Sequence, residues 1–279
     1  MRYSNGRQNV GLEPSKNRQT VIGLLLHDVT DSPNQSGFQQ PTAARYKHSI
    51  AEFRDYLNVV QESGLTVVTT GSDDSDAAEA VVQFTFDDGG SASMESADLL
   101  EEFGWRGIYF VTTDLIGTRG FLTSHQIQSL YDRGHRIGSH SCSHPDIFRQ
   151  LSSAQMQSEW RESRQVLEDI LGAVVDTASV PGGDCSSATI EQSAAAGLIS
   201  LYTSEQLTRP WRQAGATCYG RLMMVNTTTR ASLRRWLTYP RVGILPERAI
   251  RFTKTGVKKL IGPAYGAMMK RRRSLHEPA

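Results

Sequence analysis

The alternation of apolar strand patterns with amphipathic helix patterns limits this chain to a few architectures. Residues 21–29 (VIGLLLHDV) form a nearly continuous apolar run, which is typical of a strand buried on both faces. A helix pattern follows, with Ser49 as its N-cap and Gly64 as the glycine that ends it. Because strand and helix patterns continue to alternate up to residue 225, the sequence predicts a parallel sheet or a β/α barrel.

The same two patterns assign the other elements. Helices are expected over residues 94–103, 123–131, 152–171 and 186–196. Strands are expected over residues 65–70, 81–86, 106–112, 135–138, 174–180, 198–203 and 218–225. Reactive side chains follow several of these strands at their C-terminal ends, namely His27, Asp87, Asp88 and His140. Barrel enzymes gather their chemistry at that face, so we expect a barrel.

Length and composition favour one domain with two flanking segments. A chain of 279 residues with 38% hydrophobic and 21% charged residues can bury a full core. The three cysteines are too few and too widely spaced for a disulfide framework, which favours a reducing compartment. No signal peptide and no run of about 18 apolar residues is visible, so we expect a cytoplasmic protein. We divide the chain into a polar N-terminal segment (1–20), an α/β domain (21–229) and a basic C-terminal extension (230–279).

The C-terminal extension differs from the rest of the chain in charge. Its thirteen basic and two acidic residues give it a formal charge of +11 within a total of +1. Apolar residues stand between these charges, so the extension could contact an anionic membrane surface as basic amphipathic segments do. A solvated tail without a binding role is the alternative. We expect no nucleic acid partner.

Two adjacent carboxylates follow the strand predicted at residues 81–86, in the segment FTFDDGG (84–90). Asp87 and Asp88 would both lose solvent there and repel each other, so they need a compensating cation. A divalent metal bound by one carboxylate would leave the other free to act as a base. An Asp-Asp-Gly turn is also a common way to end a strand without any chemistry.

A second segment, GSHSCSHP (138–145), holds two histidines four residues apart. On a helical turn, His140 and His144 would face one side and could bind one ion. Two histidines and an aspartate form a facial set that leaves positions open for water and substrate. Zinc is the default ion for this set, and iron, cobalt or nickel would also fit. We interpret Cys142 as a packing residue and His135 as a strand residue.

Together, FTFDDGG and GSHSCSHPDI (138–147) resemble the motifs of the polysaccharide deacetylase family, the NodB-type carbohydrate esterases of family 4. The resemblance extends over residues 21–225 and implies a distorted, seven-stranded β/α barrel that removes acetyl groups from sugars. It implies that Asp87 is the catalytic base. It also implies that Asp88, His140 and His144 hold the metal.

The chain departs from the family pattern outside these two motifs. Ser179 stands where the family carries an arginine that holds the base, so this arginine is expected to be missing. The Asp-x-x-Asp-Trp motif is not visible, and MVN (224–226) stands near the place of the late Leu-x-His that supplies the general acid. Some members resemble a circularly permuted arrangement with this histidine on the first strand, and LLH (25–27) matches it. The resemblance therefore assigns the acid role to His27, although a first-strand His-Asp can also simply close a strand.

The expected function is removal of acetyl groups from N-acetylated sugars of a polysaccharide or a lipid-linked glycan, in the cytoplasm or at the inner face of the membrane. Pro181, Gly182 and Gly183 are expected to form a loop whose backbone N–H groups lie near the substrate. Two alternatives stay open. The chain could be an amidase for another small amide on the same scaffold, or a glycan-binding homologue that has lost catalytic residues.

Overall fold

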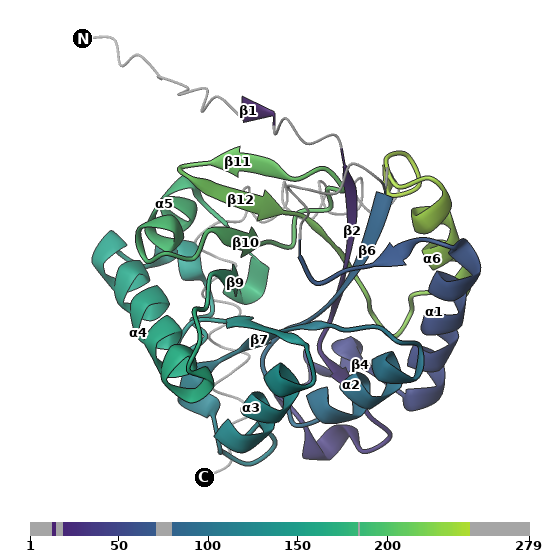
Figure 1. Ribbon diagram of the computed structural model, residues 1–279, viewed down its shortest axis with the longest axis horizontal. Helices are drawn as coiled ribbons and strands as arrows, with labels where there is room; N and C mark the ends of the chain where they lie inside the picture. Colours follow the sequence, from purple (N-terminus) through teal and green to yellow (C-terminus); the bar gives the residue numbers. More distant parts are fainter. Residues whose placement is uncertain (1–12, 15–18, 71–79, 184, 246–279) are drawn as a thin grey trace.

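A mostly parallel sheet surrounded by helices forms the centre of the protein (Figure 1). The computed structural model describes residues 13–14, 19–70, 80–183 and 185–245. Along the sheet the strands are β1 (Glu13–Pro14), β11 (Trp211–Gln213), β12 (Ala216–Tyr219), β10 (Ser200–Tyr202), β9 (Thr177–Ser179), β8 (Arg136–Ser139), β7 (Ile108–Val111), β6 (Ala80–Phe86), β2 (Thr20–Leu26) and β13 (Arg221–Met223). Strand β5 (Thr66–Val67) also pairs with β6, and β3 (Asp28–Val29) pairs with β4 (Lys47–His48) in a separate small sheet.

The sheet closes into a barrel at residues 216–223, where the chain stops pairing with β10 and begins to pair with β2. Strand β12 pairs in parallel with β10, and β13, only one residue later, pairs in parallel with β2. The strand predicted over residues 218–225 is therefore wrong as one element, because its two halves pair with different strands that are far apart along the sheet. Counting β12 and β13 as one staggered strand gives seven around the barrel, with β2, β6, β7, β8, β9 and β10 as the others. The distorted β/α barrel is confirmed.

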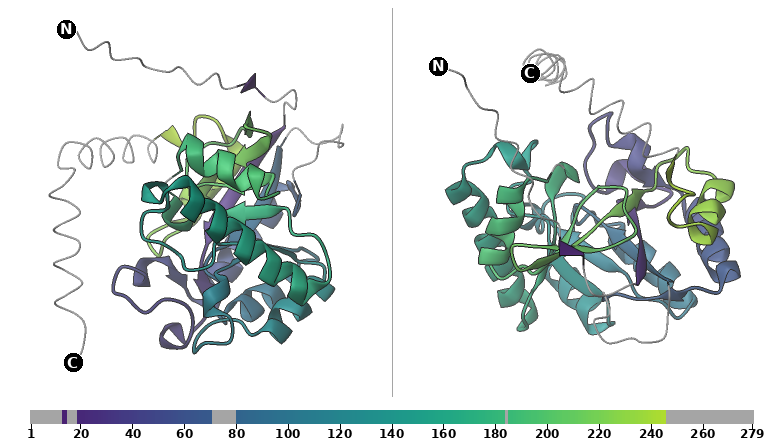
Figure 2. Two further views of the ribbon diagram at one scale, coloured as in Figure 1. Left: turned by 90° about the vertical axis from the view of Figure 1, so that its left-hand side faces the viewer. Right: turned by 90° about the horizontal axis from the view of Figure 1, so that it is seen from above.

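Helices cover the outside of the strands, as the further views show (Figure 2). They are α1 (Ile50–Ser63), α2 (Ser93–Glu102), α3 (Ser124–Asp132), α4 (Ser153–Leu171), α5 (Ser187–Ala195) and α6 (Arg230–Thr238). The predicted caps are confirmed: the Ser49 hydroxyl accepts a hydrogen bond from the Glu52 amide, and Gly64 ends α1 with a φ of 69°. These boundaries could be predicted because a cap depends only on neighbouring residues.

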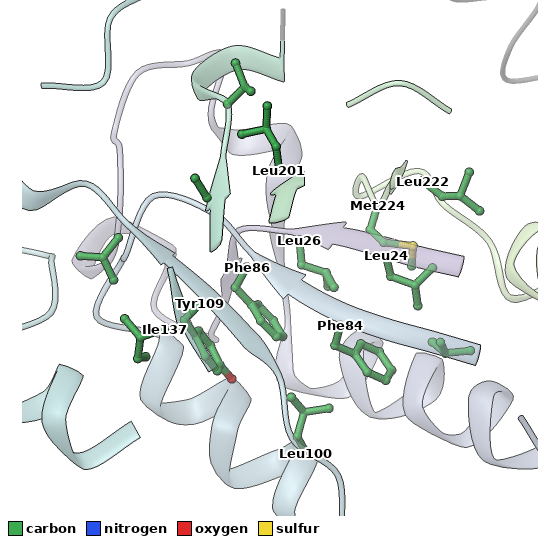
Figure 3. Close-up of a cluster of buried hydrophobic side chains, with 14 of the residues drawn as sticks. Leu24, Leu26, Phe84, Phe86, Leu100, Tyr109, Ile137, Leu201, Leu222 and Met224 are labelled. Carbon is green, nitrogen blue, oxygen red and sulfur yellow. The ribbon is translucent and has the colours of Figure 1, made fainter. Parts of the chain in front are cut away.

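The strands are buried on both faces, as the apolar run in β2 predicts. Side chains on the outer face pack under the helices in one cluster, in which Phe84 and Phe86 lie toward Leu100 of α2 and Leu24 lies toward Leu222 and Met224 (Figure 3). The inner face is different, because it carries polar side chains next to large rings. Its buried residues include Val81, Phe110, Tyr202, Thr85 and Arg221.

Two predicted boundaries differ from the structure. The strand predicted over residues 21–29 divides at His27, because β2 pairs with β6 whereas β3 turns away to pair with β4. Helix α6, which the sequence places in the basic extension, contacts α1 and buries Leu233, Trp236 and Leu237. The basic residues beyond 245 lie outside the described residues. None of the helices in the described ranges has the length and apolarity needed to cross a membrane.

Gly220 lies where the chain passes from β12 to β13, and a side chain there has no room. A Cβ atom would collide with the backbone carbonyl oxygens of Glu205 and Leu207. We predict that Gly220→Ala lowers the free energy of unfolding by about 3 kcal/mol in urea denaturation, as strained core substitutions do. Gly117→Ala is the control, since Gly117 has positive φ and open space around it and should lose only about 1 kcal/mol. Equal losses in the two variants would contradict the explanation that close packing at Gly220 fixes the passage from β12 to β13.

Candidate active site

The reactive side chains identified in the sequence meet at one edge of the barrel. His27 follows β2, Asp87 and Asp88 follow β6, and His140 follows β8. These strands are parallel, so their C-terminal ends meet at the same face. The four residues therefore lie at the C-terminal face of the barrel, where the sequence places them.

Asp88, His140 and His144 form a group that can hold one metal ion. The Nε2 atoms of His140 and His144 lie 3.3 Å and 3.5 Å from Oδ1 of Asp88. One ligand atom from each residue lies within 4.8 Å of the others. Nitrogen and oxygen ligands about 2.1 Å from a shared tetrahedral ion lie roughly 3.4 Å apart, so the spacing fits a metal with three protein ligands. The donor set also fits, since it leaves a coordination position for water or substrate.

Two of the three candidate metal ligands occupy unusual backbone conformations. Asp88 has a φ of 78° and His144 a φ of 53°, in the left-handed region that few side chains adopt. The prediction of a helical turn between His140 and His144 is wrong, because the chain here is an irregular loop. Such strained residues persist where the surroundings hold them in place, and they are often found at functional sites.

Glu159 of α4 holds the loop that carries His144. Its carboxylate accepts hydrogen bonds from the backbone N–H groups of Cys142 and Ser143, both 2.9 Å long, and another from the Ser143 hydroxyl. Cys142 itself lies outside the metal-binding group and its thiol donates to the Glu159 carbonyl, which agrees with a packing role. His135 is also no ligand, since its ring accepts a hydrogen bond from the Gly107 amide and contacts Glu101.

His140 is oriented by the backbone of β9. Its Nδ1 lies 2.9 Å from the carbonyl oxygen of Ser179, so Nδ1 carries the proton and donates it. This orientation leaves Nε2, which faces Asp88, as the ring atom that could bind a metal. A second hydrogen bond of this kind is the usual way in which proteins fix a metal-binding histidine.

Arg221 holds Asp87, the candidate base. This corrects the expectation that Asp87 has no arginine partner. The fully buried guanidinium donates two parallel hydrogen bonds to Asp87, of 2.7 Å and 2.9 Å. It also donates to the hydroxyls of Thr85 and Ser179 and to the Thr203 carbonyl, so all five N–H donors have acceptors. Ser179 in turn donates to Asp87 at 3.0 Å. The serine that stands in place of the family's arginine is thus part of the same network.

The barrel interior is shaped around Arg221. Gly23 is its register partner on β2, and a Cβ atom at Gly23 would lie 3.0 Å from the Arg221 Cγ. The guanidinium carbon lies 5.6 Å from the centre of the Phe110 ring and 6.0 Å from that of Tyr202, which is within cation–π range. Burial alone would raise the pKa of Asp87, but Arg221 and then His140 outweigh it and hold the pKa below its usual range. Asp87 is therefore an ionised carboxylate beside the metal-binding group.

His27 lies next to this group on the side of β2. Its ring stacks on Tyr46 with centroids 4.7 Å apart, and the Arg45 guanidinium lies 5.2 Å from the Tyr46 ring. The Asp87 amide donates a 3.0 Å hydrogen bond to the carbonyl of Leu26, so His27 and Asp87 follow neighbouring strands at the same level. The structure thus places the histidine of the first strand beside the metal-binding residues.

The predicted loop at residues 181–183 begins two residues after Ser179 and forms a 3-10 turn. Gly182 has a φ of 63° there. The amide of Gly183 donates to the Val180 carbonyl, so this N–H is used within the turn. Ser204 donates to the Gly183 carbonyl and fixes the turn from the other side. A role of the loop in substrate binding stays a prediction.

Part of the chain is similar to a known family. Residues 74–200 match the model of the family "Polysaccharide deacetylase". YxkH of Bacillus subtilis (strain 168), whose name assigns it provisionally to the polysaccharide deacetylases, is 24% identical over 161 residues, which cover 55% of this chain and 57% of YxkH. The chain therefore spans little more than half the length of this relative. The matched segment is the one that carries Asp87, Asp88, His140 and His144.

Solved structures agree in fold. The polysaccharide deacetylase BC0361 of Bacillus cereus superposes with a TM-score of 0.65 at 19% identity, over 76% of this chain and 67% of BC0361. IcaB of Ammonifex degensii superposes with a TM-score of 0.65 at 17% identity, over 80% of this chain and 98% of IcaB. At such identities the likeness shows the shared barrel alone. Arg221 lies beyond the residues that match the family model.

A double-mutant cycle tests the buried ion pair. We predict that Arg221→Met lowers the free energy of unfolding by about 4 kcal/mol, because it leaves the Asp87 charge buried and unpaired. Adding Asp87→Asn removes that charge, so the double variant should be clearly more stable than the sum of the two single losses predicts. Urea denaturation of the four proteins measures this coupling. Additive losses would show that the two side chains do not interact as described.

Proposed function

We propose that this chain is a metal-dependent hydrolase that removes acetyl groups from N-acetylated sugars of a polysaccharide or a lipid-linked glycan. The observation that carries the proposal is the position of an ionised, arginine-held Asp87 next to the Asp88, His140 and His144 group. The match of residues 74–200 to the polysaccharide deacetylase family model supports the reaction class. Zinc is the metal that we propose first, and iron, cobalt or nickel are the other candidates for this donor set.

Asp88, His140 and His144 would hold the metal through one carboxylate oxygen and two Nε2 atoms. A bound divalent ion supplies Lewis acidity and lowers the pKa of a coordinated water. Asp87 removes the proton from the attacking water, and its Oδ2 atom lies 4.0 Å from the His140 Nε2. Arg221 donates hydrogen bonds to both carboxylate oxygens of Asp87, so the carboxylate keeps one orientation. Asp87 would then act as a proton acceptor rather than as a metal ligand.

His27 would act as the general acid. An amine leaves poorly as an anion, so the nitrogen of the sugar must receive a proton as the C–N bond breaks. His27 follows β2, which lies on the other side of β6 from β7 and β8, and its ring stacks on that of Tyr46. The products are acetate and a free amino sugar.

The roles of Asp87 and His140 can be separated by substitution. We predict that Asp87→Asn keeps bound metal but lowers acetate release from N-acetylated oligosaccharides by about 10³-fold, because the general base is lost. His140→Ala should lose both metal and activity. Metal analysis and an acetate assay, with and without chelator, measure the two effects.

Exposed residues of the same types provide the controls. Asp132→Asn and His125→Ala, both on α3, should leave metal content and acetate release unchanged. Acetate release by Asp87→Asn at the wild-type rate would rule out Asp87 as the base. Full metal binding by His140→Ala would contradict the ligand set.

The acid role of His27 predicts a dependence on the leaving group. We expect His27→Ala to lower kcat on an N-acetylated sugar by about 10²-fold or more while metal content is unchanged. Hydrolysis of an activated aryl acetate should fall much less, since a phenolate leaves without protonation. An unchanged kcat on the amide would show that the acid lies elsewhere.

The place of the chain in the cell belongs to the same proposal. The basic extension supports a cytoplasmic protein that contacts the inner face of the membrane and acts on a lipid-linked glycan. Most of these basic residues lie outside the described residues. One alternative was a glycan-binding homologue that has lost catalytic residues. The absent arginine at Ser179 no longer supports it, because Arg221 holds Asp87 instead.

A further inference from the structure

The loop of residues 140–144 joins two candidate metal ligands, and each of its five backbone N–H groups donates a hydrogen bond. In chain order, the acceptors are the Val111 carbonyl, the Ser139 hydroxyl, the Glu159 carboxylate twice and the Ser141 hydroxyl. The two N–H groups in the middle, those of residues 142 and 143, are thus held by one side chain on helix α4. The conformation of the loop therefore depends on Glu159.

Two residues of this loop have backbone conformations that side chains rarely adopt. Ser141 has a φ of 64° and His144 a φ of 53°. Such conformations persist only where the surrounding structure holds them. The Nε2 atom of His144 lies 3.5 Å from Oδ1 of Asp88, and a relaxed loop would carry this ring away. His140 is less sensitive, because its ring is held separately by the carbonyl of Ser179.

The packing of α4 on the barrel keeps Glu159 in place. The helix contacts β8 and buries Met156, Trp160 and Ser163. The Ser163 hydroxyl also lies 2.5 Å from the hydroxyl of Ser139, at the end of the strand that leads into the loop. Helix and loop are therefore joined at the base of the loop by the two serines and in its middle by Glu159.

The side chain of Glu159 makes three contacts with the loop. Its Oε2 atom accepts the N–H groups of Cys142 and Ser143, each at 2.9 Å, and its Oε1 atom accepts the Ser143 hydroxyl at 2.5 Å. Hydrogen bonds to a carboxylate are roughly twice as strong as those between neutral groups. A glutamine would keep the shape of this side chain but accept the same N–H groups more weakly. An alanine would remove the acceptor.

We infer that Glu159 is a positioning residue for the metal: it holds His144 in the geometry of a ligand and so sets the affinity of the site for the ion. The inference rests on the proposed metal-dependent function and adds to it a residue outside the ligand set. Side chains that orient metal ligands through hydrogen bonds typically change metal affinity by about 10- to 100-fold when they are removed. A residue that only stabilised the fold would leave the metal affinity of the folded chain unchanged.

Calorimetric titration of the metal-free chain with zinc tests the inference, at a temperature where circular dichroism shows each variant folded. Glu159→Ala should bind zinc about 10- to 100-fold more weakly than the wild-type chain. Glu159→Gln should show a smaller loss. The matched control is Glu162→Ala, which removes an exposed carboxylate of the same helix that bonds only to the Ser158 hydroxyl, and it should bind zinc like the wild-type chain. Equal zinc affinity of Glu159→Ala and the wild-type chain, whatever the change in the free energy of unfolding, would overturn the inference.

Acetate release from N-acetylated oligosaccharides separates this inference from the proposed function. Excess zinc should restore release by Glu159→Ala, because all three ligands are present, but should not restore release by Asp87→Asn. Release by Glu159→Ala that stays low at saturating zinc would overturn a role through metal affinity. Weaker zinc binding by Glu159→Ala without acetate release by any protein would uphold the positioning role and contradict the proposed function. A wild-type chain that binds no divalent metal would overturn both.

Discussion

The buried ion pair between Arg221 and Asp87 is the interaction on which the rest of the active site depends. Each partner lies inside the barrel, where an unpaired charge would cost several kcal/mol, typically about 3–5 when a single partner is removed. Arg221 satisfies its five donors with groups from β6, β9 and the chain after β10. The pair therefore joins the strand that closes the barrel to the strands that carry the reactive residues. Since a buried ion pair is rarely more stabilising than well-packed apolar side chains, its presence here fits a functional role.

This arrangement explains how the chain differs from the family pattern without losing its site. The arginine expected before Pro181 is replaced by Ser179, and an arginine on another strand reaches the same carboxylate. Ser179 is small enough to leave room for the Arg221 guanidinium, and its hydroxyl bonds to both partners of the pair. Gly23 provides the matching space on β2. The serine at position 179 in the motif and the arginine at position 221 in the barrel wall are thus physically linked.

Features that depend on neighbouring residues could be predicted from the sequence, whereas those that depend on barrel closure could not. The caps of α1 and the metal group formed by Asp88, His140 and His144 follow from short segments, and the structure brings the three ligands together as expected. The division of residues 216–223 into β12 and β13 depends on which distant strands accept each half. Arg221 was missed for the same reason. One signal was present, because an arginine within the apolar run CYGRLMMV must find a buried partner.

A crystal structure of the zinc-loaded protein with acetate, with the metal located by its anomalous scattering, tests this account most directly. We expect one zinc ion about 2.0–2.2 Å from Asp88, His140 and His144. Acetate should occupy the open position, with Asp87 next to it and still held by Arg221. A zinc ion bound elsewhere, or Asp87 released from Arg221 to become a metal ligand, would contradict the account.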